Sequence, residues 1–142
     1  MSERYVSLDQ LVHTIQTEAV YVVVQRRRHY NTCNYGEFIG YINGADRMRW
    51  DAFVPGYTGL PRNVPLRVKG IVGILMTETG NHKVAVTVDS DCAYDRHLAL
   101  QQASSFKQKY IFKKSMHCEF FVTEADVISQ DSSSSSYSVP SS

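Results

Sequence analysis

The stretch Tyr30–Tyr57, YNTCNYGEFIGYINGADRMRWDAFVPGY, is the most informative part of the chain, and the rest of the fold is interpreted outward from it. Asp46 and Asp51 lie on what reads as a loop that enters the apolar strand Ala52–Val54. Upstream, Asn34-Tyr35-Gly36 places polar groups beside a glycine, which lets a backbone approach a ligand closely. Carboxylates near a tyrosine and basic residues predict a site for a hard cation and phosphate, although ordinary polar loops share this composition.

The segments before this stretch predict one helix and one buried strand. Ser7–Thr17 has apolar residues at helical spacing, and Ser7 and Gln10 are placed for a capping box. Ala19–Val24 is an apolar, largely β-branched run, which is typical of a buried strand. The cationic run Gln25–His29 follows at once. Such a run predicts a solvated turn, or alternatively a rim that faces an anion.

The segments after the stretch predict a loop and then a hairpin. Gly56–Pro65 contains two glycines and two prolines and is interpreted as a loop. Leu66–Met76 predicts a long strand whose Gly70 and Gly73 permit a bend or bulge of the kind that closes small barrels. Lys83–Val88 returns as the second strand of the hairpin.

The C-terminal third predicts a helix, a strand and a tail. Asp95 is placed as the N-cap of a helix over Arg96–Tyr110, and Cys118–Val122 is an apolar strand. Several short strands around one main helix predict a mainly β fold with α-helices, of the α+β class, built as a small, highly curved, OB-like β-barrel flanked by helices. We expect a single domain over residues 1–128 and a disordered Ser-rich tail over 129–142.

Composition narrows the functional classes. The chain has 142 residues, 43% of them hydrophobic and 20% charged, as is usual for one globular domain. A formal net charge of +1 argues against a general polyanion binder. Three cysteines without a close pair suit a reducing compartment, and no apolar run approaches the ~18 residues that span a bilayer. We therefore expect a cytoplasmic protein that does not enter a membrane.

The central stretch resembles the soluble (family I) inorganic pyrophosphatases. The run Cys33-Asn34-Tyr35-Gly36 is similar to the CNYGF-like run of that family, and the loop Asp46–Asp51 is similar to its acidic D-G-D-P-x-D loop. The resemblance covers most of residues 19 to 122 and implies an inorganic pyrophosphatase-like barrel. Further segments match in the same order, namely Pro65–Met76, Thr77–Val86, Tyr94-Asp95-Arg96-His97 and Phe106–Tyr110.

The resemblance implies a set of site residues. Family members hydrolyse pyrophosphate with Mg²⁺ ions held by carboxylates. By position, the metal ligands would be Asp46, Asp51 and Glu78. Contacts to substrate or another anion would come from Tyr35, Lys83 and Tyr110 by their match to the family, from Arg26 in one alignment, and from the added cations Arg47 and Arg49. No residue is assigned a catalytic role.

Several positions depart from the family pattern. Met48 stands where the middle aspartate of the loop belongs, and a thioether is a poor ligand for Mg²⁺. Asn81 and Ile111 replace an aspartate and a lysine. The N-terminal strand aligns in two ways, with Gln25 in place of a glutamate or with Arg26 as the family arginine. Either alignment loses several catalytic groups.

Three hypotheses follow from these matches and losses. The first is a degenerate pyrophosphatase-like protein, a pseudoenzyme that binds phosphate or a pyrophosphate-like anion or has a structural role. The second is an active inorganic pyrophosphatase or another phosphoanhydride hydrolase, with Mg²⁺ as cofactor; without that activity no cofactor is expected. The third is an OB-like binder of single-stranded nucleic acid. Its contacts would come from basic and aromatic residues, namely Arg26, Arg27, Arg28, Arg47, Arg49, Tyr30, Tyr35 and Trp50. A homo-oligomer is compatible with all three hypotheses.

Overall fold

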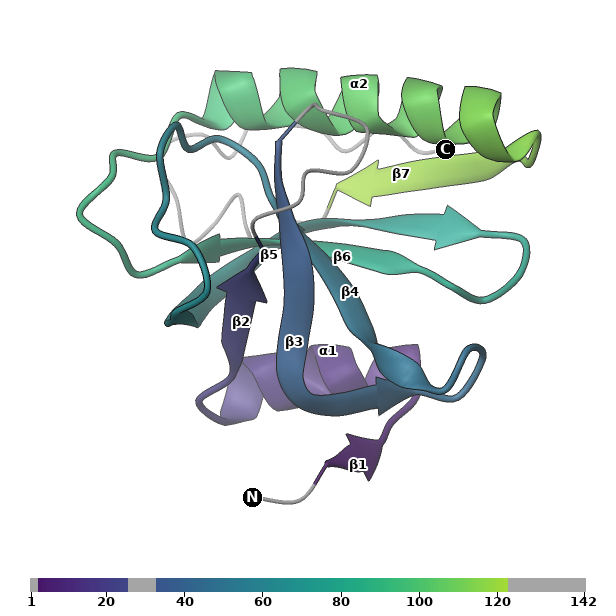
Figure 1. The fold of residues 1–142 in the computed structure, drawn as a ribbon, viewed down its shortest axis with the longest axis horizontal. Helices are drawn as coiled ribbons and strands as arrows, with labels where there is room; N and C mark the ends of the chain where they lie inside the picture. Colours follow the sequence, from purple (N-terminus) through teal and green to yellow (C-terminus); the bar gives the residue numbers. More distant parts are fainter. Residues whose placement is uncertain (1–2, 26–32, 123–142) are drawn as a thin grey trace.

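The strands of the molecule form a curved barrel, and two helices lie on opposite sides of it (Figure 1). The computed structural model describes residues 3–25 and 33–122. Arg26, most of the cationic run and the Ser-rich tail therefore lie outside the described residues. In chain order the elements are β1 (Arg4–Tyr5), α1 (Leu8–Thr17), β2 (Tyr21–Val24), β3 (Asn34–Asn43), β4 (Met48–Val54), β5 (Pro65–Thr77), β6 (Lys83–Val88), α2 (Arg96–Lys114) and β7 (Cys118–Val122).

Five strands close on themselves. The order β3-β2-β5-β6-β4 is completed by a pairing of β4 with β3, so β2 to β6 make a closed barrel. All neighbours in it are antiparallel except β4 and β6, which run parallel. Outside the ring, β1 forms a parallel pair with β3, and β7 forms an antiparallel pair with β5. The predicted OB-like barrel flanked by helices is confirmed.

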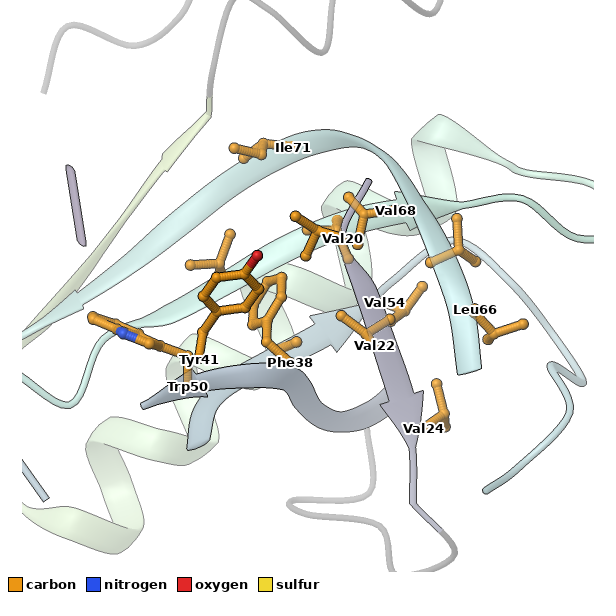
Figure 2. Close-up of a cluster of buried hydrophobic side chains, with 14 of the residues drawn as sticks. Val20, Val22, Val24, Phe38, Tyr41, Trp50, Val54, Leu66, Val68 and Ile71 are labelled. Carbon is orange, nitrogen blue, oxygen red and sulfur yellow. The ribbon is translucent and has the colours of Figure 1, made fainter. Parts of the chain in front are cut away.

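The interior of the barrel is filled by apolar side chains from every strand of the closed ring. Phe38, Trp50 and Val22 are buried there, among a cluster of valines from β2, β4, β5 and β6 (Figure 2). Leu11 of α1 belongs to the same cluster, so α1 packs against the barrel on this side. A second cluster, described below, lies between the outer surface of the barrel and α2. The barrel is thus held by one core inside and one core outside.

Local sequence signals account for several elements. The Ser7–Gln10 capping box is present at the start of α1, with the Gln10 amide donating to Ser7 Oγ at 3.1 Å. Asp95 caps α2 through a bond from the Leu98 amide to its Oδ1 at 3.0 Å. The β5–β6 ladder shifts register at Gly70 and again before Gly73, as the bulge prediction required.

The structure corrects three expectations. β4 begins at Met48, so Asp51 lies within a strand and not on the loop before it. β3 runs for ten residues, and the glycine expected to face a ligand, Gly36, faces its neighbouring strand: a Cβ there would overlap the Val23 carbonyl oxygen of β2. α2 continues four residues beyond Tyr110, to Lys114, and ends at Ser115 in the left-handed conformation. Within 3–25 and 33–122, no helix is long and apolar enough to cross a membrane.

Candidate functional site

α2 covers the outer surface of the barrel at the residues of the central stretch. Tyr35 of β3 and Phe53 of β4 are paired across the ladder and point away from the barrel interior, into the second core. Phe106 of α2 stacks on both rings, with centroids 4.8 Å from Phe53 and 5.5 Å from Tyr35. Phe106 is fully buried. Two aromatic rings on adjacent strands are therefore already occupied by a third ring from the same chain.

This surface is where OB-like barrels bind their ligands. In such barrels the face of the second and third strands receives oligonucleotides or oligosaccharides. β3 and β4 are the second and third strands of this barrel in chain order. The α2 helix packs on them through Phe106, and Phe120 of β7, the strand that pairs with β5, adds to the same core. In this conformation Tyr35 has no open face on which a base could stack.

Lys83 links two strands and α2. It faces Asp51 across the parallel β4–β6 pair, and its Nζ donates to Asp51 Oδ2 at 2.8 Å and to the Asn81 carbonyl at 3.1 Å. The ring of Tyr110 lies 5.2 Å from the same Nζ. The lysine is only 3% exposed. A buried ammonium with a carboxylate, a carbonyl and an aromatic face around it is fully engaged within the protein.

Arg49 is likewise paired inside the chain. Its Nε lies 2.6 Å from Glu3 Oε2 and its Nη1 lies 3.2 Å from Glu37 Oε2. The hydrogen bond to Glu3 raises the pKa of the Arg49 guanidinium, so the group stays charged. Arg49 and Lys83 are thus two cations set against three carboxylates, those of Glu3, Glu37 and Asp51. This balance does not favour an added anion.

The remaining predicted residues lie on two neighbouring turns. Asp46 and Arg47 are exposed in the turn between β3 and β4, where Asp46 Oδ1 accepts the Met48 amide at 3.0 Å. Glu78 is exposed in the turn between β5 and β6. The Asn43 side chain joins the turns by donating to the Gly80 carbonyl at 3.2 Å. Among the residues that the structure describes, no three His, Cys, Asp or Glu side chains gather into a group that could hold a metal ion.

Trp50 and its neighbours have structural positions. The Trp50 side chain is 2% exposed and donates from Nε1 to the Val6 carbonyl at 3.0 Å, so it fills the core and does not present its ring to a nucleic acid. His82 stacks on Trp50 and accepts the Thr77 amide at Nδ1. Burial, together with the nearby charge of Lys83, lowers the pKa of His82 and favours its neutral form. Burial raises the pKa of the Cys118 thiol, so that sulfur is not an activated nucleophile.

Sequence reasoning missed the partners of the predicted residues. Glu3 and Glu37 pair with Arg49, and Phe106 covers Tyr35. One signal was present: alternation along β4 places Asp51 and Phe53 on the same face, opposite to Trp50. Of the nine predicted site residues, the structure brings Asp51, Lys83 and Tyr110 together.

The comparisons with known proteins add no relative. The chain matches no protein-family model, no curated protein and no solved structure.

Proposed function

We propose that the protein is a degenerate, inorganic pyrophosphatase-like barrel with a structural role, a pseudoenzyme whose former substrate and metal residues now hold its own fold together. The observation that carries the proposal is the Lys83–Asp51 ion pair beneath Tyr110. In an enzyme of that family these groups would face solvent, metal and phosphate. Here Lys83 is paired with Asp51 and lies against the Tyr110 ring, and the lysine is almost completely buried.

The charge around this pair supports the same proposal. Mg²⁺ needs several oxygen ligands that are free to turn toward it. Asp51 already accepts from Lys83, while Asp46 and Glu78 lie on exposed turns. An anion would meet Arg49 only after displacing Glu3 and Glu37. The three free cysteines, Cys33, Cys92 and Cys118, support a cytoplasmic location for such a protein.

Phosphate release from pyrophosphate tests this function. The full chain at high concentration, with and without Mg²⁺, should release no more phosphate than a protein-free sample. Asp51→Asn and the exposed Asp46→Asn serve as a matched pair. Mg²⁺-dependent release that Asp51→Asn abolishes, in a variant that keeps its fold by circular dichroism, would overturn the proposal and favour the hydrolase.

A second candidate function, binding of single-stranded nucleic acid, is favoured by a different surface from the one expected. Phe112 near the end of α2 is 86% exposed, and Lys109 and Lys113 are exposed on the same side of the helix. An aromatic ring between lysines can stack on a base while the cations meet phosphates. An oligonucleotide that binds in a salt-dependent manner and loses affinity in Phe112→Ala would support this candidate; unchanged affinity in that variant would remove it.

A further inference from the structure

A cavity of about 500 Å³ lies beside β3, on the side of the barrel where β1, the end of α1 and the start of β2 meet. The pairing of β3 with β2 ends there at Phe38, and the pairing of β3 with β1 begins only at Tyr41. Between them the β3–β4 ladder shifts register, and Gly40 adopts φ +95°. A Cβ built at Gly40 would meet no atom within 4 Å. The cavity is therefore a consequence of the bend in β3.

The walls of the cavity are apolar and aromatic. Val20 and Tyr41, which belong to the barrel core (Figure 2), form part of the lining. Ile39 of β3 and Tyr21 of β2 add to it, and the Tyr21 side chain is 41% exposed. Small-molecule sites in proteins have volumes of roughly 300 to 1,000 Å³ and are lined mainly by such side chains. The cavity has the size and character of a site for a compact apolar group.

Two opposite charges line the same cavity. The Arg4 guanidinium lies over the Tyr41 ring, 5.3 Å from its centroid, and its Nη2 is 3.4 Å from the tyrosine hydroxyl. Glu18, the residue that ends α1, also lines the cavity. Within the described part of the chain neither Arg4 nor Glu18 forms an ion pair, with the other or with a third residue. Each charge is thus available to a ligand.

We propose that this cavity binds a free α-amino acid with a large apolar or aromatic side chain, whose carboxylate meets Arg4 and whose ammonium meets Glu18. A simple anion would satisfy Arg4 but would be repelled by Glu18. An uncharged apolar molecule would fill the walls but would use neither charge. A zwitterion with an apolar body matches the walls and both charges. This site lies apart from the Lys83–Asp51 pair and does not depend on the function proposed above.

Isothermal titration of the full chain with three related probes tests the assignment. The probes are L-tryptophan, L-tryptophanamide, which lacks the carboxylate, and N-acetyl-L-tryptophan, which lacks the ammonium. The wild-type protein should prefer tryptophan to each of the others by about tenfold, as one charge-assisted hydrogen bond allows. Equal affinity for all three, or no binding of tryptophan at millimolar concentration, would overturn the proposal.

Variants assign each charge separately. Arg4→Gln should bind tryptophan and its amide equally while still rejecting the N-acetyl compound. Glu18→Gln should show the reverse pattern. Lys69→Gln, an exposed cation on β5 away from the cavity, is the matched control and should bind as the wild type does. Preference patterns that do not change in Arg4→Gln and Glu18→Gln would contradict the assigned orientation.

Filling the cavity gives an independent test of its location. Ala19 is exposed and lines the cavity, so Ala19→Trp should abolish binding of all three probes. Retained binding in a folded Ala19→Trp protein would place the site elsewhere and overturn the proposal. Should that variant not fold, the two charge variants decide the question, because both change exposed side chains.

Discussion

The surface under α2 and the cavity beside β1 use similar residues in opposite ways. Under α2 the aromatic rings are stacked on one another, and Arg49 and Lys83 are both paired with carboxylates. Beside β1, Arg4 lies over a tyrosine and lines the same cavity as Glu18, without an ion pair to a described residue. Both of these cations of the first surface are therefore paired within the protein. A charge that is already paired inside the fold is not available to a ligand, whereas an exposed charge beside an apolar cavity is.

The largest expected effect is loss of the stacked ring. Phe106→Ala should lower the free energy of unfolding by about 3 to 5 kcal/mol, because it removes a fully buried aromatic side chain between α2 and the barrel. Urea denaturation measures this. Phe112→Ala on the same helix is the control and should change stability by less than about 0.5 kcal/mol, since that ring is exposed. Equal effects would mean that α2 does not pack on β3 and β4 through Phe106.

The buried ion pair should rank next. Lys83→Met leaves Asp51 without its cation and should cost about 3 kcal/mol. Asp51→Asn should cost a similar amount because it leaves a buried ammonium. In a double-mutant cycle the combined variant should lose clearly less than the sum of the two. Additive losses in the free energy of unfolding would show that the two groups do not act as a pair and would contradict the proposed structural role.

Comparison of the two arginines addresses the contrast directly. Arg49→Gln should lower stability by about 1 kcal/mol, because two partly exposed ion pairs are lost, and the loss should shrink at high salt. Arg4→Gln should leave stability almost unchanged and affect only ligand binding. A larger loss of stability in Arg4→Gln than in Arg49→Gln would reverse the assignment of the two surfaces.

The smallest effect concerns pH. His82 has a lowered pKa in the folded protein, so at mildly acidic pH the unfolded protein binds a proton on His82 more readily than the folded protein does. The stability that neutral His82 contributes should be present above its ordinary pKa of 6.5 and decline as the pH drops below that value. Thermal midpoints between pH 7.5 and 5.5 should fall less in His82→Gln than in the wild type. An identical decline in both proteins would assign the pH dependence to other groups.

The sequence predicted those elements whose signals are local. The Ser7 and Asp95 caps, the glycine bulges of β5 and the bounds of β6 and β7 follow from residues within a few positions of each other. β1, with only two residues, has too short a pattern to detect. The length of β3 was also missed, because its residues were interpreted as part of a site.

The candidate site was harder to predict than the fold. Which carboxylate meets Arg49 depends on the N-terminal segment reaching β4, which no local pattern reveals. The resemblance to the pyrophosphatases predicted Asp51 and Lys83 as site residues, but only the parallel β4–β6 register makes them partners. The cavity arises from the bend at Gly40, and its charges come from segments that carry no recognisable motif.

Closure of the barrel has a consequence for how the chain folds. The β3–β4 and β5–β6 hairpins join neighbouring segments, whereas β2 must find β5 and β4 must find β6 across much longer stretches of chain. Each distant pairing carries a loop-closure entropy before it gains contacts. We therefore expect the hairpins to form early and the ring to close in the rate-limiting step, on a timescale of roughly milliseconds to seconds. Substitutions at the Tyr21–Arg67 pairing should then change the folding rate more than the unfolding rate.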